Sequence, residues 1–296
     1  MLDYAALAAL SAVIREGSFE RAASTLHVTA SAVSQRIRAL EERVGCPLVV
    51  RDQPCRPTEA GQRLCNHIDH VRLLESELRE ALPALAGEGG TRASLPIAVN
   101  ADSLATWFAP ALAGFAAQSA VLIQVSVDDQ DHTRDWLHRG AVMAAVTGTE
   151  RPATGCDCQP LGAMRYLAVA SPAFMARFFG DGITARSLSL APSLMFNAKD
   201  DLQARWVRRQ CRRPVELPRH TLPSSHAFVT AAVAGMGWGL QPLAMIRSQL
   251  EAGSLVELVP GTPLDVRLYW QQLRVASRWL DGLTRDVLSA ARQALI

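Results

Sequence analysis

Two patterns of hydrophobic spacing divide this chain and limit what it can fold into. Up to about residue 86, apolar residues recur at intervals of three and four, which predicts amphipathic helices. From Leu95 onward, short apolar runs alternate with helical segments, which predicts a doubly wound α/β sheet. The 296 residues suffice for two or three folding units, and a hydrophobic content of 49% excludes a mostly disordered chain.

A helix, a short turn and a further helix are predicted between residues 18 and 44. Ser18 and Thr29 are suitable N-caps for these two helices. In the second helix, apolar residues spaced by four, three and four form one buried stripe: Val33, Ile37, Leu40 and Val44. The other face carries hydrogen-bonding side chains suited to base edges and phosphates: Ser31, Ser34, Gln35 and Arg38. This pattern fits a DNA-reading helix-turn-helix, and it fits a solvated helix of any three-helix bundle equally well.

The next segment predicts a β-hairpin wing. An apolar run at residues 45–51 leads into a proline-rich loop at 52–57. Arg51 and Arg56 lie in this hairpin, where they can hold phosphates or enter a minor groove; ordinary surface arginines are the alternative. Residues 1–58 contain seven Arg against six Asp and Glu, a net charge of +1, so DNA binding has to depend on where the cations are placed.

A long helix is predicted over residues 59–86, with Thr58 as its N-cap. At ~1.5 Å per residue it would be about 40 Å long. Its apolar residues form a single stripe: Leu64, Ile68, Val71, Leu74, Leu78, Leu82 and Leu85. A single stripe on a protruding helix needs a partner, so we expect a coiled-coil-like dimer seam. The glycine-rich residues 87–90 predict a flexible hinge after it.

Several short runs carry a resemblance to a known family. They are residues 19–23 (Phe-Glu-Arg-Ala-Ala), 28–37 (Val-Thr-Ala-Ser-Ala-Val-Ser-Gln-Arg-Ile), Leu40-Glu41 with Gly45, and 57–61 (Pro-Thr-Glu-Ala-Gly). Their order and spacing resemble the winged helix-turn-helix of LysR-type transcriptional regulators. Within that family, residues 98–107, 164–167 and 268–270 resemble the regulators of lysine and arginine export.

The resemblance implies three parts: a winged helix-turn-helix DNA-binding domain at 1–58, a linker helix and hinge at 59–90, and a two-lobed, periplasmic-binding-protein-like effector domain at 91–296. Lobe I would comprise about 91–163 plus 267–296, and lobe II about 164–266. The implied partners are double-stranded DNA, a basic amino acid, RNA polymerase, and further copies of the chain in a homodimer that assembles to a homotetramer. The residues expected on DNA are Ala30, Ser31, Ser34, Gln35, Arg36, Arg38, Arg51 and Arg56.

Polar residues at the carboxyl ends of the predicted strands are the candidates for effector binding, since ligands of open α/β sheets bind there. Hydroxyls and amides at helix starts suit an α-carboxylate, and several carboxylates suit the cations of lysine or arginine. Together with the resemblance, this predicts a site made of Asn100, Ser103, Thr106, Trp107, Asp128, Asp129, Thr147, Asn197, Asp200, Asp201, Ser224 and Ser225. Each Ser, Asp and Asn can instead be only a helix N-cap. Related regulators carry an acidic residue where this chain has Asn197, and a Glu where it has His226, which weakens a cation-binding role for Asn197.

Other functions find less support in the sequence. No signal peptide opens the chain, and Pro and Gly interrupt both long uncharged segments, so we expect a cytoplasmic protein that does not contact a membrane rather than a solute-binding or transport protein. Cys156 and Cys158 are expected in a loop without a metal, and Gly235-x-Gly-x-Gly239 predicts a helix end and turn. An enzyme acting on amino acids is the remaining alternative; without a catalytic motif we expect neither enzyme activity nor a cofactor.

Overall fold

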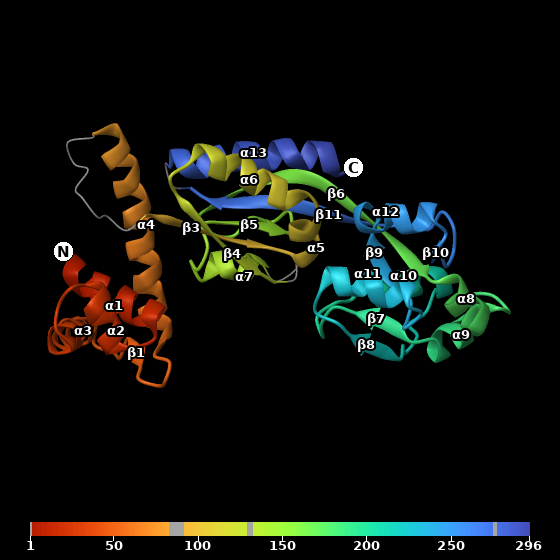
Figure 1. Cartoon of the computed structure of the whole chain (residues 1–296), viewed down its shortest axis with the longest axis horizontal. Helices are drawn as coiled ribbons and strands as arrows, with labels where there is room; N and C mark the ends of the chain where they lie inside the picture. The colour runs from red at the N-terminus through yellow and green to blue at the C-terminus, as the bar shows by residue number, and fades with distance from the viewer. Residues whose placement is uncertain (1, 83–91, 129–132, 275–276) are drawn as a thin grey trace.

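The computed structural model describes residues 2–82, 92–128, 133–274 and 277–296. Figure 1 shows a small helical unit at the N-terminal end, a long helix that leads away from it, and an α/β region that divides into two lobes. The predicted fold class, a winged helix-turn-helix followed by a two-lobed α/β domain, is confirmed.

Three helices build the N-terminal unit: α1 (Tyr4–Glu16), α2 (Phe19–Thr25) and α3 (Ala30–Val44). Helices α2 and α3 begin at the predicted caps, because the Ser18 and Thr29 hydroxyls accept hydrogen bonds from backbone N–H groups of the first turn. The predicted α3 stripe is buried at Val33, Ile37 and Leu40. The prediction that Val44 belongs to it is wrong: this last residue of α3 is 40% exposed, and the chain turns away directly after it at Gly45.

The wing is a short antiparallel hairpin of β1 (Val49–Val50) and β2 (Arg56–Pro57), followed by α4 (Glu59–Ala81). Thr58 joins wing and helix, since its hydroxyl donates to the Pro47 carbonyl at 2.8 Å and accepts from the Gly61 N–H at 3.1 Å. Gly61 allows the close approach of α4, because a Cβ at this position would lie 2.0 Å from the Leu48 carbonyl oxygen.

Helix α4 packs against both the N-terminal unit and the α/β region, so part of its apolar stripe is buried within the chain. Ile68 is buried in the N-terminal core, where Leu64 and Val71 also pack, whereas Leu73 is buried in the core of the α/β region. The prediction of one dimer seam along the whole stripe is therefore wrong for its first half, which packs within the chain. Three leucines of the second half remain exposed: Leu74, Leu78 and Leu82. Leu85 and the predicted hinge at 87–90 lie outside the described residues.

Lobe I contains a βαβαβ unit, in agreement with the predicted alternation of strands and helices. Its parallel strands lie in the order β5 (Ala144–Thr147), β3 (Ser94–Val99), β4 (Leu122–Val127). Between β3 and β4, residues 101–118 are helical and form α5 (Ala101–Ser103), a π-helical turn η2 (Leu104–Phe108) and α6 (Ala109–Gln118). Helices α6 and α13 (Arg278–Ala294) cover one face of the sheet and α7 (Thr133–His138) covers the other (Figure 1).

Lobe II has two small strand groups surrounded by helices. β7 (Ser193–Met195) pairs in parallel with β8 (Arg219–Thr221), while β9 (Gly239–Pro242) and β10 (Val256–Glu257) run antiparallel to β6 (Cys156–Ala170). The helices are α8 (Pro172–Phe179), α9 (Ala185–Leu190), α10 (Leu202–Cys211), α11 (Ser225–Val233) and α12 (Leu243–Glu251). Between α11 and β9, Gly235 takes a positive φ of 78°, in agreement with the predicted helix end.

Two long antiparallel strands connect the lobes: β6 (Cys156–Ala170) and β11 (Leu264–Leu273). The loop predicted around Cys156 and Cys158 is therefore wrong, because both residues lie on β6 and pair with β11; both thiols are free. A bulge accommodates Pro160 and Gly162, opposite Tyr269 and Leu268. Within the described ranges, no helix is long and apolar enough to cross a membrane.

Candidate functional site

The exposed side of α3 presents most of the residues predicted to contact DNA. Ser31, Gln35 and Arg38 are exposed, whereas Ala30, Ser34 and Arg36 are half-buried. Arg38 Nε donates to Glu42 Oε1 at 3.2 Å on the helix surface. To enter a major groove, the polar face of α3 must not be covered by neighbouring helices. Helix α1 packs on the opposite, apolar side of α3 and leaves this face uncovered.

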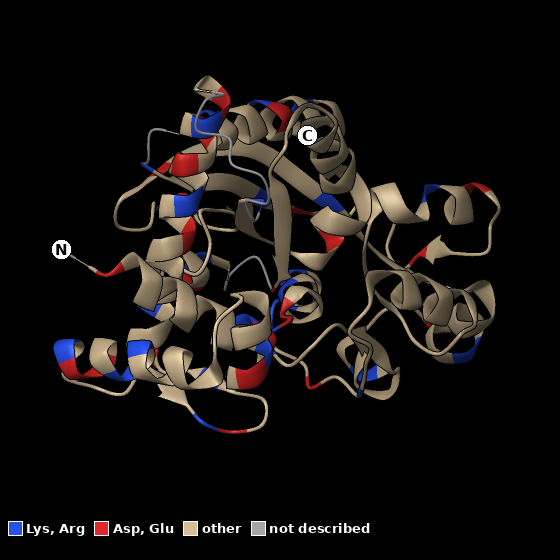
Figure 2. Ribbon diagram, turned by 60° about the vertical axis from the view of Figure 1, so that its left-hand side comes forward, with Lys and Arg blue, Asp and Glu red and all other residues tan. Residues whose placement is uncertain are grey.

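The wing arginines lie beside this helix-turn-helix. Both Arg51 and Arg56 are exposed, and the Arg51 guanidinium lies over the Phe19 ring at 5.1 Å from its centroid. This stacking holds the wing cation against α2. Figure 2 shows basic and acidic residues interspersed over the N-terminal unit, so a DNA surface here depends on individual cations, as the sequence predicted.

A second candidate site lies between the lobes, at the carboxyl ends of β3 and β4. It is a cavity of about 40 Å³. Its polar residues come from both lobes: Asn100, Asp102 and Asp128 from lobe I, and Asp200, Ser225 and Gln241 from lobe II. Phe196, Leu202 and Phe228 are among its apolar lining residues. Three carboxylates from three distant segments thus converge on one small space.

Asp102 connects the two lobes at this cavity. Its Oδ2 accepts a hydrogen bond from the Tyr166 hydroxyl at 2.8 Å, and its Oδ1 accepts one from the Ser225 hydroxyl at 2.7 Å. Burial raises the pKa of Asp102, and the two hydrogen bonds partly oppose that shift. A carboxylate buried in this way gains from a cationic ligand. Asp102 and Tyr166 were both missed as site residues, although Asp102 stands between two predicted ones, Asn100 and Ser103.

Asp200 adds to the negative charge. Its carboxylate accepts hydrogen bonds from the backbone N–H groups of Phe196 at 2.9 Å and Leu202 at 3.1 Å, which hold it at the start of α10. Burial raises the pKa of Asp200, and the nearby negative charge of Asp102 raises it further. Two carboxylates that both resist ionisation favour a ligand that brings positive charge.

Two residues that line the cavity have buried polar atoms that can bind a ligand. Asn100 Oδ1 and both amide atoms of Gln241 are buried without a hydrogen-bond partner within the described residues. Buried polar groups are nearly always paired, so these atoms are available to a bound molecule. Gln241 gave no signal in the sequence, because it lies inside strand β9 rather than at a strand end.

Asp128 forms an ion pair between the two lobes. It follows β4 directly, and its Oδ2 accepts a hydrogen bond from the indole N–H of Trp136 at 3.0 Å. Its Oδ1 accepts from Lys199 Nζ, which belongs to lobe II, at 3.2 Å. Asp129, predicted beside it, lies outside the described residues.

The remaining predicted residues do not line this cavity. Asn197 and Ser224 accept hydrogen bonds from nearby backbone N–H groups, which is the helix- and turn-capping role considered as the alternative. Asp201, the residue before α10, is paired with Arg205 of that helix at 3.6 Å, whereas the adjacent residue Asp200 lines the cavity. Thr147 is buried and accepts from the Gln271 amide. Ser103 is buried within the helix, and its hydroxyl has no partner in the described part of the chain.

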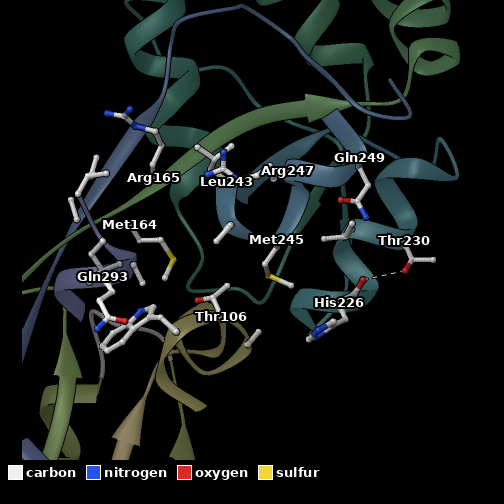
Figure 3. Close-up of a pocket in the computed structure, with 18 residues that line it drawn as sticks. Thr106, Met164, Arg165, His226, Thr230, Leu243, Met245, Arg247, Gln249 and Gln293 are labelled. Carbon is white, nitrogen blue, oxygen red and sulfur yellow. Dashed lines mark hydrogen bonds between the residues drawn. The ribbon is translucent and has the colours of Figure 1, made fainter. Parts of the chain in front are cut away.

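A larger groove, of about 770 Å³, also spans the lobes and contains Thr106 and Trp107 from the predicted set. Figure 3 shows Arg165, Arg247 and His226 among its lining residues. No acidic side chain of the described residues lines it. The groove therefore lacks the acidic side chains that surround a basic ligand, and the small acidic cavity is the better candidate for the effector site.

No group of three or more His, Cys, Asp or Glu side chains that could hold a metal ion occurs in the ranges that the structure describes.

Comparison with known proteins identifies the class. Residues 4–62 match the family of bacterial regulatory helix-turn-helix proteins of the lysR type, and residues 88–295 match the LysR substrate binding domain. The chain therefore belongs to the LysR family.

Individual relatives are similar over the full length. The HTH-type transcriptional regulator ArgP of Pseudomonas fluorescens is 44% identical over 296 residues, covering 100% of this chain and 99% of the relative. LysG of Mycobacterium tuberculosis is 46% identical over 294 residues, covering 98% and 94%. The crystal structure of ArgP from Mycobacterium tuberculosis superposes with a TM-score of 0.83, at 45% identity, covering 100% of this chain and 99% of that one. Full-length LysG from Corynebacterium glutamicum with arginine bound as effector has a TM-score of 0.72, at 37% identity, with 99% of both chains covered.

Proposed function

We propose that this chain is a DNA-binding transcriptional regulator of the LysR type whose interlobe cavity binds lysine or arginine. The observation that carries the effector class is the convergence of Asp102, Asp128 and Asp200 on one cavity. A basic amino acid has two cations, and carboxylates are the groups that bind them in water-poor sites. The arginine bound to the LysG relative supports the same ligand class.

The unpaired groups suggest how the ligand is oriented. The Gln241 amide N–H donates to the α-carboxylate, and Asn100 Oδ1 accepts from the α-amino group or the side-chain cation. Asp102 and Asp200 then compensate the ligand's positive charge. Ser103, expected on the carboxylate from the sequence, does not line the cavity and is replaced in that role by Gln241.

The parts of the chain act together in this proposal. Residues 1–58 bind double-stranded DNA through α3 and the wing, residues 59–90 link and dimerise, and residues 91–296 bind the effector. We place the lobe boundaries at 163/164 and 266/267, which the β6–β11 register supports because Met164 pairs with Val266 and Ala163 with Arg267. An effector that contacts both lobes changes their relative placement, and through a homotetramer it changes the spacing of the DNA-binding pairs and the approach of RNA polymerase. A regulator of this kind acts in the cytoplasm and catalyses no turnover.

Calorimetry with the twenty amino acids tests the effector class directly. We expect lysine and arginine to bind, and norleucine, which has lysine's length without its cation, to bind at least tenfold more weakly. Equal binding of neutral amino acids contradicts the effector assignment, and turnover of any amino acid by the purified chain favours the enzyme alternative. Operator binding is measured in parallel at several salt concentrations.

A further inference from the structure

Lys199 is the only lysine among the 296 residues, and its ammonium contacts Asp128, which lines the acidic cavity. It belongs to the turn between β7 and α10, whose shape is set by Asn197: the Asn197 side chain accepts hydrogen bonds from the backbone N–H groups of Lys199 at 2.7 Å and Asp200 at 3.2 Å. The same turn thus presents an acid to the cavity and, one residue earlier, a cation to the opposite lobe.

The contact that Lys199 makes is the contact a basic ligand needs. Its Nζ donates to Asp128 Oδ1 at 3.2 Å, across the cleft, and Asp128 is one of the three aspartates of the cavity. A lysine side chain carries the same primary ammonium group that free lysine has at the end of its side chain. One acceptor oxygen of the effector site is therefore held by a group of the protein itself.

We propose that Lys199 is a built-in competitor for the effector: its ammonium occupies Asp128 in the ligand-free protein, and a basic amino acid must displace it to bind. This inference rests on the proposed effector site. It makes Lys199 a residue that sets the concentration at which the regulator responds, and it makes the Lys199–Asp128 pair a link between the lobes that effector binding breaks.

The geometry suits a contact that is made and broken. The Lys199 side chain is 47% exposed, so its ammonium can return to water at low cost, and an ion pair this open is weak. Asp128 keeps its position without Lys199, because its other oxygen is held by the Trp136 indole N–H at 3.0 Å. Removing the lysine head group therefore leaves the carboxylate in place.

Calorimetry on the full chain with Lys199→Met tests the proposal, because methionine keeps the length of the stem and removes the charge. We expect arginine and lysine to bind two- to fivefold more tightly, which corresponds to about 0.4–1 kcal/mol. Arg205→Met is the matched control: it removes one cation from the same lobe, but its partner Asp201 lies outside the cavity, so we expect no change. Equal tightening in both variants reduces the effect to overall charge and overturns the proposal.

Weaker binding in Lys199→Met also overturns it, because that result means that Lys199 donates to the effector's carboxylate. Unchanged binding does the same, since it means that the pair does not compete with the ligand. If the parent protein binds no basic amino acid, the proposed function itself is wrong. If the parent binds and Lys199→Met binds no more tightly, only the competitor role of Lys199 is wrong.

The single lysine also permits a direct observation. Protein labelled with ¹³C at the lysine ε-carbon gives one lysine side-chain signal in an NMR spectrum. We expect arginine to move this signal toward the position it has in the Asp128→Asn variant, where the charged partner is missing. A signal that stays fixed while arginine saturates the site rules out displacement.

Discussion

The contact between Gly61 and the wing allows a prediction about the DNA-binding unit alone. Gly61 and Gly114 both lie inside helices, α4 and α6, where alanine is favoured over glycine by roughly 0.5–1 kcal/mol. From local propensity, Gly→Ala is therefore expected to stabilise the protein at both positions. The surroundings of the two glycines give opposite expectations.

At Gly114 the nearest atom to an added Cβ is Asp286 Oδ2, at 4.0 Å, so the propensity gain is realised. At Gly61 the added Cβ lies 2.0 Å from the Leu48 carbonyl oxygen, which is backbone and cannot rotate away. Helix α4 and the wing must move apart by about 1 Å before the added Cβ reaches even a tight contact distance. This movement distorts the hydrogen bonds of Thr58 to the Pro47 carbonyl and from the Gly61 N–H. Overpacking typically costs about 1–3 kcal/mol and a broken hydrogen bond about 1 kcal/mol, so we expect Gly61→Ala to destabilise this unit by about 2–4 kcal/mol.

Two spectroscopic signals separate the effects. All six tryptophans follow residue 100, so their fluorescence reports on the α/β region, whereas far-ultraviolet circular dichroism also detects the N-terminal helices. We expect Gly61→Ala to produce an early dichroism transition, lower by roughly 10 °C or more, while the fluorescence midpoint and lysine binding stay as in the parent. Gly114→Ala should melt at or slightly above the parent. If Gly61→Ala is as stable as Gly114→Ala, the close contact between α4 and the wing is not present in the protein.

Three further predictions concern DNA, assembly and pH. Gln35→Ala should lower discrimination between operator and random DNA by roughly 1–3 kcal/mol. Arg51→Ala should weaken binding to both DNAs and reduce the slope of log K against log salt concentration by about 1. Unchanged binding isotherms for both variants would show that α3 and the wing do not contact DNA. Leu78→Asp, at an exposed position of α4, should give a folded monomer, because a charge would face its own copy, and light scattering that still shows an intact dimer places the seam elsewhere. Burial raises the pKa of Asp102, and a cation binds its ionised form, so effector affinity should be full above that pKa and fall as the pH drops through it; Asp102→Asn should weaken lysine binding about tenfold or more and flatten this pH dependence in calorimetry.

Much of the fold could be predicted because it follows from short-range rules. Ser18, Thr29 and Thr58 begin their helices as caps, since a side-chain oxygen needs only the N–H groups two or three residues ahead. The alternation of strands and helices over lobe I is equally local. The predicted polar residues at strand ends included Asn100, Asp128, Asp200 and Ser225, all of which line the interlobe cavity.

Tertiary contacts decided the rest. Residues 156–163 contain Pro160 and Gly162, which locally favour a loop, yet pairing with β11 through a bulge makes them strand. The leucines of α4 share one periodic stripe, but which of them are buried depends on the two units packed beside the helix. Asp200 and Asp201 are equivalent in the sequence, and only the direction of the first turn of α10 sends one into the cavity and the other to Arg205.

The composition of the effector site depends most on the tertiary structure. Asp102 lies 64 residues before Tyr166 and 123 residues before Ser225 in the chain. The three residues meet only because β6 and β11 bring the two lobes together. Gln241 enters the site from inside a strand, where no local pattern marks it. A hydrogen bond or an ion pair across such separations has no signature in residue spacing, because periodicity records which side of one element a residue is on and not which other element that side will meet.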